Sequence, residues 1–139
     1  MKVSIPTFTK DEDDYYEKLL NDVAIQIGVP EIIDHKWLCN DERSRMIWYF
    51  IAKKLENNNS MYFNFKNSIE KWRNDKNIND YWYVEWNNLF SRIEKEGFSV
   101  LYESSEKMQE LRSMPPDFII QIDSKLRYKI LKFILNKYK

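Results

Sequence analysis

The feature that most constrains the fold of this sequence is a helix-capping motif near the N-terminus, followed by apolar residues at helical spacing. Thr9 is followed three residues later by Glu12, the spacing of a capping box, in which each side chain satisfies a backbone N–H at the start of a helix. Apolar residues then recur at intervals of three and four, which is the period of a helix with one buried face: Tyr16, Leu19, Leu20, Val23 and Ile27. Gly28, with Pro30 beyond it, marks the end of this helical pattern. The pattern predicts an α-helix between Thr9 and Gly28.

Two further helices are expected before residue 57. Residues 30–38 place Ile33 and Trp37 one turn apart and predict a short helix. Asn40 or Asp41 then begins a third helix that runs to about residue 56. Its centre, residues 46–52, carries no charge over seven residues, which is typical of a helix contacted on several sides.

Residues 60–73 fit two patterns. Met61, Phe63 and Phe65 alternate as in a strand, whereas Met61, Phe65, Ile69 and Trp72 follow a helical period. No neighbouring segment offers an obvious strand partner, so we favour a helix.

The C-terminal half predicts three more helices. Asn79 or Asp80 begins one that carries an apolar face and ends at Gly97. Ser104 begins a short one, which the prolines at 115 and 116 end. Asp123 begins the last, whose inner face consists of Leu126, Ile130, Phe133 and Ile134.

Two runs between these helices have strand character. In residues 98–102, Phe98, Val100 and Tyr102 alternate, and residues 118–122 form a second apolar run. The two runs can pair as a small ribbon lying on the helices. With no internal repeat and no linker-like segment, we expect one domain over residues 1–139: a mostly α, compact bundle of five to seven helices, with this ribbon as its only β-structure.

Composition restricts the environment of the chain. Of its 139 residues, 43% are hydrophobic, so it can bury a core without a disulfide or a metal. The single cysteine, Cys39, fits a reducing compartment. The N-terminus lacks the apolar core of a signal peptide, and no apolar run approaches the roughly 20 residues of a membrane span. We therefore expect a cytoplasmic protein that does not enter the membrane.

The residue types argue against several kinds of chemistry. The only glycines, Gly28 and Gly97, are 69 residues apart, whereas nucleotide-binding loops need clustered glycines. One histidine and one cysteine are too few for common zinc sites. His35 and Cys39 are four residues apart and could form a catalytic pair, but adjacent Trp37 and Leu38 favour ordinary packing. We expect no cofactor, no metal site and no catalytic residues.

Charge is balanced overall but separated along the chain. Lysine and arginine together number 22, as do aspartate and glutamate, yet residues 10–22 have a net charge of −4 and residues 123–139 one of +5. These oppositely charged segments either pair with each other or give the domain one acidic and one basic face.

The leading functional hypothesis is a non-enzymatic protein that acts by docking onto another protein. The expected contact residues are acids of the first helix and two tyrosines outside the main apolar stripes of their helices: Asp11, Asp13, Asp14, Glu17, Tyr49 and Tyr81. The chain resembles, in gross character and not through any motif, small antagonists of bacteria or phages such as immunity proteins. The partner would then be a toxin or nuclease whose basic cleft the acids occupy. The structural alternative is that the acids only complement the helix dipole.

A second hypothesis is a small nucleic-acid-associated regulator. The basic terminal helix carries the expected phosphate contacts, Lys125, Arg127, Lys129 and Lys132. The structural alternative is a solvated amphipathic helix whose cations suit its C-terminal end.

Overall fold

The computed structural model describes residues 5–75, 78–113 and 122–139, which contain six α-helices and one 3-10 helix, η1. The expected mostly helical fold of five to seven helices is therefore confirmed. The helices belong to two compact units. Residues 1–47 and 122–139 belong to the first unit, and residues 48–121 to the second.

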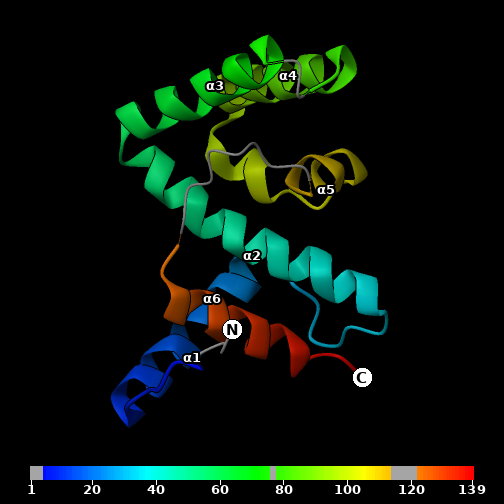
Figure 1. Ribbon diagram of the computed structural model, residues 1–139. Coiled ribbons are helices and arrows are strands. Elements are labelled where there is room, and N and C mark those ends of the chain that lie inside the picture. The colour runs from blue at the N-terminus through cyan, green and yellow to red at the C-terminus, as the bar shows by residue number, and fades with distance from the viewer. Residues whose placement is uncertain (1–4, 76–77, 114–121) are drawn as a thin grey trace. The chain divides into compact units, whose positions relative to one another are not determined.

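The first unit contains α1 (Lys10–Ile27), the beginning of α2 (Lys36–Glu56) and α6 (Ser124–Leu135). Both hydrogen bonds of the predicted capping box are present: the Glu12 N–H donates to Thr9 Oγ1 at 3.1 Å, and the Thr9 N–H donates to Glu12 Oε1 at 3.0 Å. Gly28 ends α1 in the left-handed conformation, with φ 78° and ψ 38°. α1 packs along α6 (Figure 1). Both helices contribute buried side chains: Leu20, Val23, Ala24, Ile27, Ile130 and Ile134.

The prediction of a separate helix over residues 30–38 is wrong. Residues 31–35 are irregular, because the backbone of Ile33 pairs with the end of the chain. The Ile33 N–H donates to the Lys137 carbonyl at 2.9 Å, and the Lys139 N–H donates to the Ile33 carbonyl at 3.0 Å. α2 begins at Lys36 and runs without a break to Glu56, so Asn40 and Asp41 lie inside it and not at its start.

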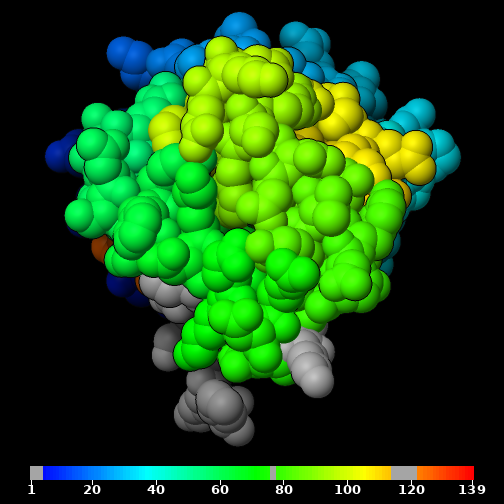
Figure 2. All heavy atoms as spheres, turned by 90° about the horizontal axis from the view of Figure 1, so that it is seen from above, coloured from blue at the N-terminus to red at the C-terminus, as the bar shows by residue number. Residues whose placement is uncertain are grey.

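The second unit contains α3 (Asn59–Asn74), α4 (Asp80–Glu96), η1 (Phe98–Tyr102) and α5 (Glu106–Arg112). The favoured helix over 60–73 is confirmed: Phe65 and Ile69 are buried, whereas Phe63, which belonged to the strand pattern, is 62% exposed. Asn79 begins α4 as predicted, with its side chain accepting the Trp82 N–H at 3.0 Å. Figure 2 looks onto the face of this unit that the side chains of α3 and α4 cover.

The predicted strand over residues 98–102 is wrong. These residues form the 3-10 helix η1. The residue before it, Gly97, has a positive φ of 96°. Consecutive residues Val100 and Leu101 are both buried there, which a strand with one solvated face does not allow. Residues 118–121, most of the second ribbon strand, lie outside the described residues. Ser105, and not Ser104, caps α5. Asp123 precedes α6 as expected but makes no side-chain capping hydrogen bond.

Aromatic side chains form much of the second unit's core. Phe65 lies at the centre of the group, with ring centroids 5.7 Å from Trp86 and 5.4 Å from Phe90. Trp48 packs on the same ring at 6.1 Å. The Phe65–Phe90 pair is edge-to-face and the other two are tilted, and aromatic contacts of these kinds stabilise a core beyond the burial of apolar area.

Candidate functional site

The acidic and basic segments of the sequence meet in the first unit. Lys125 Nζ lies 2.7 Å from Glu12 Oε2, and Lys129 forms an ion pair with Asp13. Both ammonium groups also lie over the ring of Phe8, at 5.6 and 4.3 Å from its centroid. Of the two arrangements that the charge separation allowed, pairing between the segments is thus present, and it holds α1 against α6.

The Glu12–Lys125 pair changes the pKa of both groups. The Lys125 hydrogen bond, aided by the Thr9 backbone N–H, lowers the pKa of the Glu12 carboxyl. The same hydrogen bond raises the pKa of the Lys125 ammonium. Both groups therefore stay charged across the neutral range, and their charges largely cancel at this edge of the unit.

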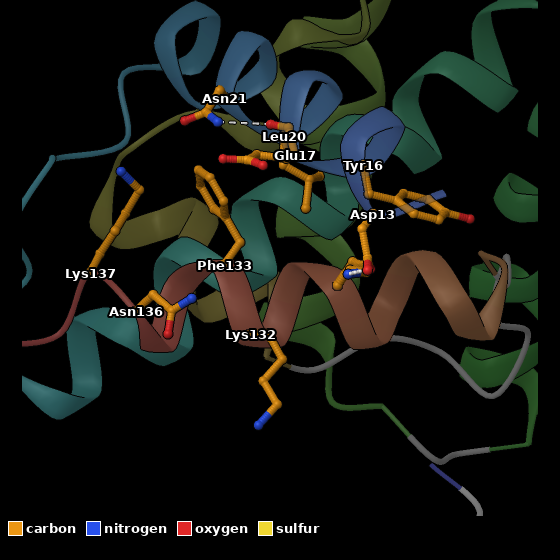
Figure 3. Close-up of a pocket in the computed structure, with 10 residues that line it drawn as sticks. Asp13, Tyr16, Glu17, Leu20, Asn21, Lys132, Phe133, Asn136 and Lys137 are labelled. Carbon is orange, nitrogen blue, oxygen red and sulfur yellow. Dashed lines mark hydrogen bonds and ion pairs between the residues drawn. The ribbon is translucent and has the colours of Figure 1, made fainter. Parts of the chain in front are cut away.

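A groove with a volume of about 500 Å³ lies between α1 and α6 (Figure 3). It brings together two of the predicted partner-binding acids, Asp13 and Glu17, with two of the predicted nucleic-acid contacts, Lys129 and Lys132. Phe133 lines the groove from α6, and in Figure 3 the Lys132 ammonium points away from α1.

The lining of this groove carries charges of both signs. Carboxylates line one side and amines the other, so a ligand with a single sign of charge gains little there. Its lining contains neither His35 nor Cys39, the residues considered for nucleophilic chemistry. Within the described parts of the chain, no cluster of three or more histidine, cysteine, aspartate or glutamate side chains could hold a metal ion.

The other two predicted acids lie on the opposite side of α1. Asp11 and Asp14 are exposed and share this side with Tyr15, which is 62% exposed, and Ile25, which is 82% exposed. We call this surface the α1 outer face and define it by Asp11, Asp14, Tyr15, Lys18, Asp22 and Ile25, which follow a helical period. Sequence reasoning missed Tyr15. Its place beside the predicted apolar stripe, and not within it, was the signal that could have revealed it.

The two predicted contact tyrosines belong to the second unit and differ in environment. Tyr49 is half-buried, with its ring 5.3 Å from that of Tyr102 and with Lys53 over it at 5.3 Å. Tyr81 is 54% exposed, and Lys107 both hydrogen-bonds its hydroxyl and lies over its ring. Tyr81 therefore remains accessible to a partner, whereas much of the Tyr49 ring is already packed.

The His35–Cys39 pair has no catalytic geometry. Cys39 is buried, whereas His35 is exposed and stacks on Trp37 with ring centroids 6.3 Å apart. The contact that joins the two residues is a backbone hydrogen bond from the Cys39 N–H to the His35 carbonyl.

Comparison with known proteins adds no functional information. The chain matches no protein-family model, no curated protein and no solved structure. None of the helices in the described part of the chain is both long and apolar enough to cross a membrane.

Proposed function

We propose that this protein is a non-enzymatic antagonist that docks onto another protein and neutralises it, in the manner of an immunity protein acting on a toxin or effector. The observation that carries the proposal is the α1 outer face, where the exposed residues Asp11 and Asp14 share one side of the helix with the exposed ring of Tyr15.

Such a face combines two properties of docking surfaces. Tyrosine concentrates binding energy in a rigid ring, and nearby carboxylates speed the encounter with a basic partner. Ile25 lies ten residues beyond Tyr15, about 15 Å along the helix, and offers a second apolar contact. A partner with a basic cleft, such as a nuclease, therefore fits this face best.

The nucleic-acid alternative has less support. Two of its four cations, Lys125 and Lys129, already form ion pairs with α1. Nucleic-acid affinity and its salt dependence increase with the number of phosphates that cations of the protein neutralise. A cation already paired with a carboxylate contributes less to that number. Arg127 and Lys132 are exposed but alone form a weak phosphate-binding surface.

The proposal is tested by affinity capture from the source cells with immobilised full-length chain. The informative variant is Asp11→Lys with Asp14→Lys, because neither residue takes part in the α1–α6 ion pairs. Its matched control is Glu31→Lys with Asp34→Lys, which changes net charge equally at exposed positions between α1 and α2. We expect one protein to be retained by the wild type and the control, lost with the α1 variant, and weakened between 50 and 300 mM salt, concentrations on the order of those that screen surface charge.

The next measurement is the affinity of that captured protein, by calorimetry, for the same three chains and for Tyr15→Ala. Unchanged affinity for the α1 variant contradicts the proposal. Retention of nucleic acid alone, lost on substitution of Arg127 and Lys132, supports the alternative.

A further inference from the structure

A second surface of the first unit, away from the α1–α6 groove, has a different chemistry. The first part of α2 and α6 line two hollows of about 560 and 580 Å³. Arg43 and Leu131 line both, so the hollows adjoin. One contains Ile47 and Arg127, and the other contains Lys36 and Tyr138, which shows that α2 and α6 run antiparallel here (Figure 1).

The two hollows form one groove, which we call the α2–α6 groove. Along α2 it extends from Lys36 to Ile47, a rise of about 16 Å, which equals about three turns of a helix. Much of its lining is apolar, and two of the lining side chains are unusually exposed for their type: Leu135 at 48% and Tyr138 at 44%.

The charges of this groove are of one sign. Lys36, Arg43 and Arg127 line it, and none of the described residues of the lining is a carboxylate. Among the described residues none of these three cations forms an ion pair, in contrast to Lys125 and Lys129 in the α1–α6 groove. The cations lie at one end, in the middle and at the other end of the groove.

We propose that the α2–α6 groove binds an acidic amphipathic helix of another protein. An apolar groove between two antiparallel helices accepts a third helix whose apolar side chains recur at positions i, i+3 or i+4, and i+7. Carboxylates repeated along such a helix meet Lys36, Arg43 and Arg127 in turn. A fatty acid carries a single carboxylate and matches only one of the three. The distribution of cations therefore selects a helix as the occupant.

The test uses full-length chain and fluorescein-labelled peptides of 14 residues, about four turns of helix. The acidic peptide places leucine at helical spacing with glutamate on both flanks. A second replaces every glutamate with lysine, and a third rearranges the leucines into alternation. We expect saturable binding of the acidic peptide, measured by fluorescence anisotropy, and at least about tenfold weaker binding of the other two, the effect of losing one strong contact.

Substitutions locate the binding. Arg43→Gln should weaken the acidic peptide about tenfold, and Leu135→Glu should weaken it at least as much, because it adds a repelling charge to the apolar lining. Lys71→Gln, at an exposed position of α3, is the matched control and should change nothing. Circular dichroism verifies that each variant is folded.

Four results would overturn the proposal: no saturable binding of the acidic peptide up to about 1 mM, equal affinity for the lysine peptide, unchanged affinity of Arg43→Gln, or binding of a long-chain fatty acid but not of peptide. Self-association in the ultracentrifuge that Arg43→Gln abolishes would assign the groove to a second copy of the chain. The outcome of this peptide-binding test is independent of the proposed function of the α1 outer face, since none of these substitutions lies in α1.

Discussion

Arg45 is the residue whose burial has the clearest energetic consequence. It is 4% exposed, its Nη1 lies 2.8 Å from Glu42 Oε2, and its Nη2 donates to the Ile27 carbonyl. Glu42 is itself 5% exposed. Removing one partner of a buried ion pair takes away a close contact of the other charge, so we expect Arg45→Met to lower the free energy of unfolding by about 3–5 kcal/mol in urea titrations.

The matched control is Arg45→Met combined with Glu42→Leu. Replacing both charges with apolar side chains removes the buried carboxylate together with the guanidinium, so the double variant should be more stable than the single one. A double variant as unstable as Arg45→Met would show that the guanidinium contributes mainly through contacts other than the one with Glu42, such as its bond to the Ile27 carbonyl.

The two glycines permit a comparison of backbone conformations. Both have positive φ, and a Cβ at either would meet no atom within 4 Å, so the cost of substitution is purely conformational. Gly28 lies in the left-handed helical region, which asparagine tolerates, whereas Gly97 has φ 96° and ψ 176°, a region almost restricted to glycine. We expect Gly28→Asn to cost well under about 1 kcal/mol and Gly97→Asn about 1–3 kcal/mol, measured by urea unfolding. Equal losses would contradict this interpretation.

At the scale of elements, local sequence patterns predicted some helices well. They failed where contacts with residues distant in the sequence determine the secondary structure. α1 and α4 were predicted with their caps, because Thr9, Asn79 and the glycines act on neighbouring residues. The start of α2 was missed because Ile33 pairs with Tyr138, a contact without any local signal. Residues 98–102 were assigned to a strand because a five-residue alternation of apolar residues also fits a tight helical turn.

The candidate site was predictable to a similar degree. Periodicity alone could place Asp11 and Asp14 opposite the apolar stripe of α1, but it could not reveal that Asp13 faces Lys129. The α2–α6 groove was invisible in the sequence because its cations come from two helices far apart along the chain. The pairing of residues 10–22 with residues 123–139 was one of two stated alternatives, and only the packing of α1 on α6 distinguished them.

Arg92 connects α4 with the segment that follows η1. It lies 2.9 Å from Glu96 Oε2 and 2.7 Å from Glu103 Oε2, and its hydrogen bonds lower the pKa of both carboxyl groups. A lowered folded-state pKa adds stability above the unfolded-state value near 4.5, and this stability is lost as pH falls through the folded-state pKa. We therefore expect Arg92→Gln to lower Tm more at pH 7 than at a pH below 4.5, so that the acid sensitivity of Tm decreases.

The control for Arg92 is Arg73→Gln. The Arg73 guanidinium lies over the ring of Tyr83 at 4.2 Å and, among the described residues, forms no ion pair with a carboxylate, although the Tyr83 hydroxyl donates a hydrogen bond to Glu70. Its effect on Tm should be the same at both pH values. If Arg92→Gln behaved in the same way, the ion pairs would not contribute to acid sensitivity.

At the scale of the whole molecule, a net charge of zero conceals two surfaces of opposite sign. Both lie in the first unit: the α1 outer face, with Asp11, Asp14 and Asp22 against Lys18, and the largely apolar α2–α6 groove, whose described charged residues are all cations. Between α1 and α6, the charges of Lys125 and Lys129 are neutralised by ion pairs with Glu12 and Asp13. The two proposed docking surfaces therefore carry net charges of opposite sign, as two partners of opposite charge would require.

The alkaline limit of stability follows from buried tyrosines. Burial, with a smaller contribution from the Glu94 carboxylate, raises the pKa of Tyr62 from 10.0 to about 12, and burial also raises the pKa of Tyr16 and Tyr102. Between pH 10 and 12 the unfolded chain releases the Tyr62 proton while the folded chain keeps it, so the stability present below pH 10 is lost as pH rises.

Tyr62→Phe removes this pH-dependent loss of stability. It also removes a buried hydroxyl that has no hydrogen-bond partner among the described residues, so it should not destabilise the protein at pH 8. We expect the variant to gain about 1 kcal/mol over the wild type between pH 8 and pH 11 in urea titrations, whereas Tyr15→Phe, at an exposed position, gains nothing. An equal change in both variants would mean that the alkaline transition reflects the loss of lysine charge and not the burial of Tyr62.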